Sequence, residues 1–495
     1  MASLLTIPLE LLVAVSSHLT TPDLGSLRLT CKQVEKSLYE WFSKEFFTKK
    51  QFMLTHESLQ TLVDISKHAS FSQKLSHLII ATNVYEDKPF RFRDEDAASR
   101  YKQGWEDQKT LLNTGLDREM LTEAFRRLVN LQTVGIRDFN NHERSRDGIN
   151  WTSWGATTVK EETGIDLTFT NGSMYGPQSA NAFLAHVYQN LILALGSAGC
   201  TPEGLEVLLR HSSLPDSAFN VPSFVLPTVR PLLLRLKKLF LKVDTDSDYT
   251  HIHTSGPPKE TQSGPLLRHF LGHTPNLTHL RLNLPRHTFE KNERFLKWLA
   301  LPAPAPGSPT NTTLFEPPPI KLDHLVALDL GQFHVRPDVL LDVVAKFAPT
   351  LQDLNLWKLN IIEPIAFPSN DSDGAVWKKL FLRMIKMPHL QLKTLKVGML
   401  SQNHAYVQFK NQDVKDSPLL KVKEYSGGKM EAFLRELSEE VMVAWPPGMR
   451  INQNNDDDDD DDDDADVDEE QDEDEDMIED NMEEDELDEV DEDVE

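Results

Sequence analysis

The sequence predicts an α/β protein built from three parts, and three patterns predict it. The first 46 residues hold three short amphipathic helical patterns, and the long body repeats a helix followed by a leucine-spaced strand. The last 40 residues hold 19 Asp and 11 Glu, with no Lys or Arg. We therefore expect a helical unit over 1–48, a helix–strand body over 49–450 and a disordered acidic tail over 451–495.

The first helix is expected to begin at Pro8. Proline suits a helix start because the first-turn N–H groups have no intrahelical partner, and Glu10 complements the positive end of the helix dipole. The apolar residues that follow recur at helical spacing and form one stripe: Leu11, Leu12, Val15 and Leu19.

Two further short helices are expected before residue 48. Thr21 is expected to cap the second helix with Pro22 at its first position, and the third helix begins at about Lys32. Their apolar faces are Leu24 and Leu27 in the second, and Val34, Leu38, Trp41 and Phe46 in the third. Three short helices cannot hide all this apolar surface among themselves. Unless the rest of the chain covers it, the remainder is a docking face.

These residues together resemble the F-box family. The resemblance lies in Ile7-Pro8-Leu9-Glu10-Leu11-Leu12, then Leu19, Asp23-Leu24, Leu27-Arg28 and Cys31-Lys32, all at the family's spacing. It covers about 43 residues, and two departures keep its apolar character: Ile7 replaces the usual leucine, and Leu29-Thr30 stands where valine is common. The alternative is that these are the first helices of a larger helical domain, with the stripe buried inside it.

The resemblance implies a partner and a set of contacts. F-box units dock on the Skp adaptor of cullin–RING ubiquitin ligases. Carried over by resemblance, the adaptor-binding residues are Ile7, Pro8, Leu11, Leu12, Val15, Leu19, Leu24 and Leu27.

The body repeats a strand of the form L-x-x-L-x-L, with Val or Ile in place of some leucines. It occurs at Leu75-Leu78-Ile80, Leu131-Val134-Ile136, Leu236-Leu239-Leu241, Leu277-Leu280-Leu282, Leu325-Leu328-Leu330, Leu351-Leu354-Leu356 and Leu392-Leu395-Val397. A further strand is indicated at 205–208, and clear helices at 178–197, at 339–347 and from Trp377 to Met384. Repeated strands joined by crossover helices predict a parallel sheet with helices outside it.

This body is similar to an irregular leucine-rich-repeat solenoid, an architecture often found behind an F-box. The last five units are spaced 41, 48, 26 and 41 residues apart, against about 20–29 in regular repeats. The asparagine that regular repeats carry three residues after the last leucine occurs once in the seven units, at Asn83. An ordinary α/β domain with leucine-rich strands is the alternative.

Two insertions are expected to form exposed loops. The first spans about 140–177 and carries Trp151, Trp154 and Tyr175, which either anchor a partner or pack back onto the domain. The second spans 302–319 and contains seven prolines, so we expect a stiff or disordered spacer.

We expect a non-catalytic protein with no cofactor and no metal. The sequence holds no G-x-S-x-G, H-E-x-x-H or dinucleotide fingerprint, and Gly427-Gly428-Lys429 lacks the first glycine and the Ser/Thr of a P-loop. His251 and His253 have no third ligand nearby. The two cysteines, Cys31 and Cys200, have no sequence context that indicates a nucleophile.

Charge and hydropathy indicate a cytoplasmic or nuclear protein. Thirty of the 78 acidic residues lie in the tail, which leaves 48 acidic against 51 basic residues in the first 455, so the net charge of −27 belongs to the tail. No apolar run approaches the ~20 residues that a membrane span needs, so we expect no membrane contact. We also expect no nucleic-acid binding, because the tail repels phosphate backbones.

Two functions follow as hypotheses. In the first, the chain is the substrate receptor of a ubiquitin ligase: the helical unit binds the adaptor and the body binds an unknown target protein. In the second, it is an acidic-tailed scaffold or chaperone for basic proteins such as histones, independent of ubiquitination.

Overall fold

The leucine-spaced segments fold into strands of one long sheet. The computed structural model describes residues 7–139, 152–167, 177–246, 263–304, 317–363, 375–410 and 419–444. All seven predicted segments are strands: β2 (His77–Ala81), β3 (Thr133–Arg137), β6 (Lys238–Asp244), β7 (His279–Asn283), β8 (Ala327–Gly331), β10 (Asp353–Trp357) and β12 (Thr394–Gly398). The strand indicated at 205–208 is β4 (Gly204–Leu208). The α/β fold class is therefore confirmed.

The strands of this sheet follow one another in chain order. Its path is β1-β2-β3-β4-β6-β7-β8-β10-β12-β15, and every neighbouring pair up to β12 is parallel. The sequence did not reveal the first strand, β1 (Lys49–Met53), or the last, β15 (Val422–Ser426), which pairs antiparallel with β12. The short β5 (Leu214–Pro215) pairs with β6 off this path.

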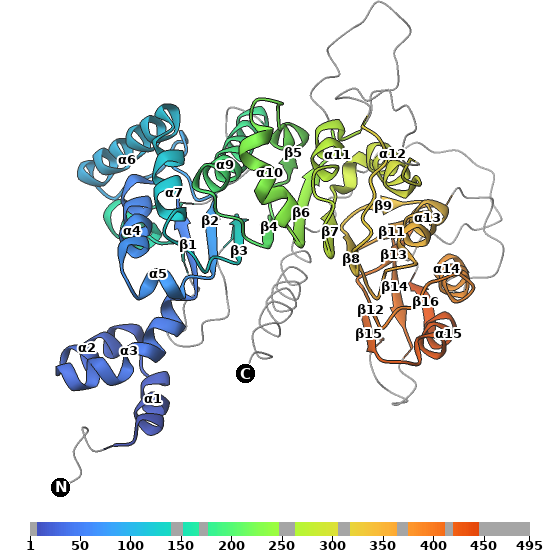
Figure 1. Ribbon diagram of the computed structural model, residues 1–495, viewed down its shortest axis with the longest axis horizontal. Helices are drawn as coiled ribbons and strands as arrows, with labels where there is room; N and C mark the ends of the chain where they lie inside the picture. Colours follow the sequence, from blue (N-terminus) through green and yellow to red (C-terminus); the bar gives the residue numbers. More distant parts are fainter. Residues whose placement is uncertain are drawn as a thin grey trace, which may run out of the picture.

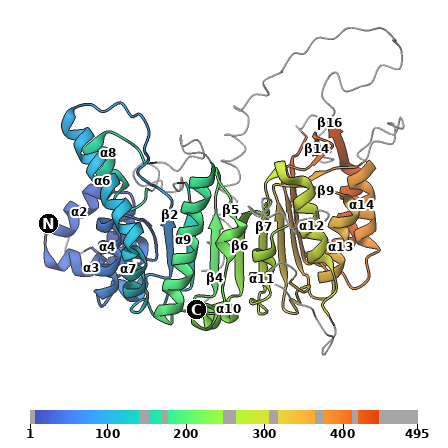
Figure 2. The ribbon, with the colours of Figure 1, turned by 90° about the horizontal axis from the view of Figure 1, so that it is seen from above.

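Helices cover one face of the sheet and leave the other to face inward. Figure 1 shows the strands along the inside of an open arc and most of the helices along its outside. Figure 2 shows the same row of helices and strands from above. The connecting helices are α4 (His56–Lys67), α5 (Phe71–Lys74), α6 (Glu95–Thr114), α7 (Leu116–Phe125), α9 (Pro177–Ala198), α10 (Leu226–Arg235), α11 (Pro265–Leu271), α12 (Phe289–Ala300), α13 (Pro337–Phe347), α14 (Ala375–Ile385) and α15 (Met430–Glu440). Two short 3₁₀ turns span Asp216–Phe219 and Arg286–Thr288.

The core lies between this helical layer and the strands. The leucines of each strand pattern, such as Leu239 and Leu241, point toward the helices and are buried in one continuous cluster with them. Because side chains alternate across a strand, the residues between these leucines lie on the opposite, inner face. The leucine spacing therefore fixes which side chains the inner face carries.

The last three parallel strands end in a repeated turn. Directly after β8, β10 and β12, Gln332, Lys358 and Met399 adopt left-handed backbone with φ of 66°, 51° and 50°. The next residues are fully buried: Phe333, Leu359 and Leu400. They stand at the asparagine position of regular repeats, so apolar packing replaces an asparagine ladder here.

A second, smaller sheet grows from these turns. Its order is β16-β14-β13-β11-β9. The members are β9 (His334–Val335), β11 (Asn360–Ile361), β13 (Ser401–Gln402), β14 (Ala405–Phe409) and β16 (Val441–Ala444). The described chain ends in β16, which pairs antiparallel with β14.

The N-terminal residues form three helices with a small core of their own. They are α1 (Leu9–Ser17), α2 (Thr21–Leu29) and α3 (Lys32–Phe47), which we call the helical unit. Its buried cluster consists of Leu12, Leu24, Val34, Leu38 and Phe46. The predicted cap of the second helix was one residue late, since Thr20 is the N-cap and its Oγ1 accepts from the Asp23 N–H at 3.2 Å.

A single residue, Thr48, joins the helical unit to the sheet. Its carbonyl accepts hydrogen bonds from the N–H groups of both Ser76 and His77 at 3.0 Å, which places it directly beside β2. The Phe47 ring at the end of α3 stacks on Phe71 of α5 at 3.9 Å between ring centroids and 2° between planes. The unit is therefore fused to the end of the arc without a linker, as Figure 1 shows at the blue end.

The described part of the first insertion packs back onto the sheet. It contains a helix, α8 (Ala156–Thr163), and Trp154 forms a parallel bridge with Phe52 of β1. The Lys50 ammonium lies 5.3 Å from the Trp154 ring centroid. The backbone of Trp154 thus pairs with β1, while its side chain remains 43% exposed, so the two alternatives for the loop aromatics stay open. Trp151 and Tyr175 lie outside the described residues, as do 305–316 of the proline-rich insertion and the tail 451–495.

Candidate functional site

The exposed surface of the helical unit is centred on α1. Leu11 is 57% exposed and Val15 is 51% exposed. These two residues are four positions apart and therefore share one side of the helix. Pro8, at the N-cap of α1, is also exposed. Three of the eight predicted adaptor contacts thus lie together on an open apolar surface.

Two of the predicted contacts lie inside the unit instead. Leu12 is 4% exposed and Leu24 is 1% exposed, and both pack in the unit's core with Leu38 of α3. The predicted stripe on α1 is therefore divided: Leu11 and Val15 face outward, whereas Leu12, like Leu24 of α2, faces the unit's core. As adaptor contacts, Leu12 and Leu24 stay a prediction. They hold the unit together.

The remaining three predicted contacts, Ile7, Leu19 and Leu27, are half-buried around the same core. Two exposed apolar residues of the unit are absent from the predicted contacts: Leu9 of α1, which is 50% exposed, and Leu29 at the end of α2, which is 88% exposed. Leu29 is the more exposed of the two. Helical periodicity could have found it: at 100° per residue it lies about 140° around the helix from the buried Leu24.

The inner face of the sheet forms a second candidate surface, which mixes charged residues with apolar ones such as Ile79 and Phe240 and is largely buried along its middle row. Its middle row, one residue per strand in register, runs Gln51, Ile79, Gly135, Glu206, Phe240, Arg281, Asp329, Asn355 and Lys396. Five cations lie on this face over β1–β7, and we call them the inner-face cations: Lys49, Arg137, Lys238, Lys242 and Arg281. Charged side chains on this face suit recognition of a charged partner.

Glu206 lies at the centre of the inner-face cations. Its carboxylate is 3.4 Å from Nε2 of His77 on β2. Burial raises the pKa of Glu206, while the charges of Arg137 and three other inner-face cations, Lys49, Arg281 and Lys238, oppose that rise. Burial, together with Lys49 and Arg137, lowers the pKa of His77 well below its usual value. The cations are therefore close enough to act on one buried acid.

A second charged cluster lies on the neighbouring strands β7 and β8. Asp329 accepts hydrogen bonds from His279 Nε2 at 2.8 Å and from Arg281 Nε at 2.9 Å. Burial alone would raise the pKa of Asp329, but the charges and hydrogen bonds of His279 and Arg281 hold it at about 2. The Arg281 guanidinium also lies 4.6 Å from the Phe240 ring centroid, which ties the cluster to β6.

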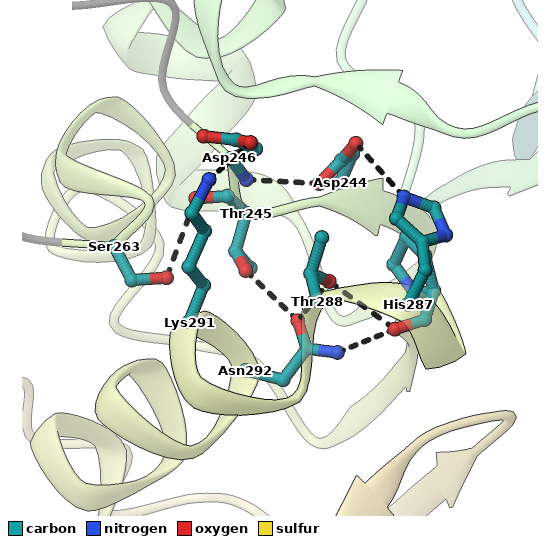
Figure 3. A network of polar contacts seen from close by, with 9 residues as sticks. Asp244, Thr245, Asp246, Ser263, His287, Thr288, Lys291 and Asn292 are labelled. Carbon is teal, nitrogen blue, oxygen red and sulfur yellow. Dashed lines mark hydrogen bonds and ion pairs between the residues drawn. The ribbon is translucent and has the colours of Figure 1, made fainter. Parts of the chain in front are cut away.

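The end of β6 is tied to α12 by a polar network (Figure 3). Asn292 of α12 accepts hydrogen bonds from the hydroxyls of Thr245 at 2.8 Å and Thr288 at 3.1 Å. Its amide donates to the Pro285 carbonyl at 2.6 Å. Because the buried Asn292 side chain is hydrogen-bonded on both ends, we interpret this network as structural.

The same network closes the ends of the segment 247–262, which lies outside the described residues. The Thr245 carbonyl accepts from Ser263 Oγ at 3.3 Å and from Gly264 N–H at 3.0 Å. Lys291 forms an ion pair with Asp246, and His287 lies 3.9 Å from Asp244 (Figure 3). Thr245 and Ser263, on either side of this segment, are therefore held next to each other beside α12.

The described residues hold no group of three or more His, Cys, Asp or Glu side chains that could bind a metal ion. Burial raises the pKa of the Cys200 thiol to about 11, which disfavours the thiolate. Cys31 is half-buried at the N-cap of α3, and His251 and His253 lie outside the described residues. A hollow of about 670 Å³ opens at the strand starts beside His324, His389 and Lys393.

The sequence matches no protein-family model and has no significant match among curated proteins. In the part of the chain that the structure describes, no helix is long and apolar enough to cross a membrane. The function proposed below therefore rests on the residues and on their placement.

Proposed function

We propose that this chain is the substrate-recognition subunit of an SCF-type cullin–RING ubiquitin ligase. The helical unit docks on the Skp adaptor, and the inner face of the sheet binds the target protein. The observation that carries the proposal is the exposed apolar surface of α1 at Pro8, Leu11 and Val15. It lies on the segment whose spacing resembles an F-box.

The free energy gained by burying exposed apolar side chains supports α1 as a docking surface. Leu11 and Val15 are each about half exposed, and covering them by a partner would contribute about 1 kcal/mol each. The unit's own core is complete without them, because Leu12, Leu24 and Leu38 fill it. The sequence thus keeps apolar side chains in water that the fold does not need, which favours a partner.

The second element of support is the fusion of the unit to the sheet. The connection through Thr48, the Phe47–Phe71 stack and an ion pair between Glu40 of α3 and Lys74 of α5 hold the unit in a fixed orientation. A ligase must hold its target at a set distance from the ubiquitin-charged enzyme. A rigid junction between adaptor-binding and target-binding parts meets that requirement.

The adaptor-docking proposal is tested by a charge substitution on α1. The full-length double variant Leu11→Asp/Val15→Asp should lose at least 100-fold in affinity for a purified Skp adaptor, because two buried, unpaired carboxylates would face an apolar interface. Binding is measured by surface plasmon resonance, and circular dichroism checks that helicity is unchanged.

Val129→Asp is the matched control for that experiment. Val129 is exposed and apolar but lies before β3 in the body, far along the chain from α1. The control should bind the adaptor as the wild type does. Wild-type protein that shows no adaptor binding at micromolar concentration would refute the proposal, and so would equal losses in the two variants.

The composition of the tail favours a second candidate function, an acidic scaffold or chaperone for basic proteins. Thirty carboxylates in 40 residues attract basic partners such as histones, with a strength that falls as salt screens the charges. This function predicts histone binding that disappears when 456–495 is deleted and that Leu11→Asp/Val15→Asp leaves unchanged. Histone binding that survives the deletion would exclude it.

A further inference from the structure

The inner face carries its positive charge in one half. The inner-face cations lie on β1, β3, β6 and β7, and the carboxylates on the same face of β1–β7 are Glu206 and, at the end of β6, Asp244. On β8, β10 and β12 the corresponding rows hold Asp329, Asp353 and Lys396. The first half of the face is therefore cationic, and the second half is mixed.

The chain itself contains a segment of opposite charge. Residues 456–495 carry 30 carboxylates and no basic residue, and the first 455 residues carry nearly balanced charge. A polyanion tethered to a cationic surface is present there at a high effective concentration, which makes docking in cis much more favourable than capture of a separate chain.

The length of the connection permits this contact. The described chain ends at Ala444 in β16, and 11 residues separate it from Asp456. Extended, these span about 36 Å. Adjacent strands are about 4.8 Å apart, so the two steps from β16 to β13, which follows β12, and the four steps from β12 to β6 cover about 29 Å, and the path to β1 covers about 48 Å. Asp456 can therefore reach β6, and later tail residues can reach β1.

We propose that residues 456–495 dock on the inner face of the sheet over β1–β7, where their carboxylates lie against Lys49, Lys238 and Lys242, which are half-exposed, whereas Arg137 and Arg281 are buried beneath this face. The tail is then an intramolecular ligand of this face. The inference does not depend on adaptor docking, and it uses the proposed function for one consequence: a target that binds this face must displace the tail.

Zero-length cross-linking of the intact protein tests the proposal. A carbodiimide joins a carboxylate to a lysine amine that already touches it, and mass spectrometry then identifies the joined residues. At 50 mM NaCl, tail carboxylates should couple to Lys49, Lys238 and Lys242 at least five-fold more often than to Lys378 and Lys379, which are exposed on α14. In 1 M NaCl the excess should disappear, because the Debye length falls to about 3 Å.

A charge-reversal pair sharpens the result. In full-length Lys49→Glu/Lys238→Glu, coupling of the tail to the remaining Lys242 should fall at least three-fold, whereas the matched pair Lys378→Glu/Lys379→Glu should leave it unchanged. The wild-type pattern alone still decides the question if the first variant misfolds.

Three results would overturn the inference. Equal coupling to inner-face and α14 lysines would show a solvated polyanion, and coupling found only between molecules would show a second copy as the occupant. Coupling to Lys242 that ignores both charge reversal and salt would show a contact that charge does not drive. Each of these outcomes leaves adaptor binding unaffected, so failure here is distinguishable from failure of the proposed function.

Discussion

The helical unit and the strand–helix arc differ in where they place their apolar side chains. The unit buries five apolar residues and leaves four exposed to water, which are Leu9, Leu11, Val15 and Leu29. The arc packs the leucines of its strand patterns into one continuous core and turns polar residues to its inner face. The unit is therefore suited to bind through apolar area, and the arc through charge.

The difference also separates their stability. A core of five residues leaves little margin, and each of its side chains carries a large share of the unit's cohesion. The arc distributes its buried residues over the eleven strands of the large sheet and the helices outside them, so each side chain contributes a smaller share of its stability. The two regions should consequently respond differently to core truncation, to pH and to relief of backbone strain.

Core truncation should give the largest effect. Leu38→Ala, at a fully buried position of α3, should destabilise the helical unit by about 3 kcal/mol through lost burial and a residual cavity. Amide hydrogen exchange should then quicken in 9–47 while the strands of the arc keep their protection. Equal acceleration in both regions would show that unit and arc unfold as one.

Acid should destabilise the arc, because it protonates Asp329 and weakens its hydrogen bonds with His279 and Arg281. The core of the helical unit consists of apolar side chains and should not respond in this way. The folded pKa of Asp329, about 2, lies below its ordinary 3.8, so its stabilisation is present above pH ~4 and is lost as the pH falls toward 2. The shift corresponds to about 2 kcal/mol. Urea unfolding should show wild type more stable than Asp329→Asn by that amount at pH 7, with the gap closing by pH 2.

The control for that measurement is Asp323→Asn. Asp323 is exposed and pairs with Lys321 at 2.7 Å, and a surface pair contributes less than about 1 kcal/mol. Its stability should stay close to wild type at each pH. A gap for Asp329→Asn that does not change between pH 7 and pH 2 would contradict the assignment.

Relief of backbone strain should give the smallest effect. His389 is exposed between α14 and β12 with φ of 65°, a conformation that costs a non-glycine residue about 1 kcal/mol. His389→Gly should therefore stabilise the arc by roughly 0.5–1 kcal/mol in urea unfolding. The control is His324→Gly. His324 is also exposed, but its φ is not positive, so this variant should lower the free energy of unfolding by a similar amount.

Much of the fold could be predicted because leucine spacing is a local signal. Each L-x-x-L-x-L segment became a strand, and the residues between its leucines became the inner face. β1 escaped prediction because Lys49-Lys50-Gln51 lacks that spacing, and its strand forms by pairing with β2. The antiparallel β15 escaped for the same reason, since its position depends on β12.

The sequence predicts which residues of α1 are apolar, but it does not predict which of them are exposed. A helical stripe shows which residues are apolar, but Leu11 and Leu12 are neighbours in sequence that the packing of α2 and α3 separates into surface and core. The inner-face clusters were beyond reach, because His77, Arg137 and Glu206 are more than 50 residues apart and meet through strand register alone.

Because a single residue, Thr48, connects α3 to β1, the number of residues in α3 determines the direction in which α1 faces relative to the sheet. Because α3 runs straight into β1, inserting one residue in α3 would turn α1 by about 100° about the helix axis and advance it by 1.5 Å. The exposed surface of α1 would then point in another direction relative to the inner face of the sheet. The length of α3 would thus set the angle between a molecule held on α1 and a molecule held on the inner face.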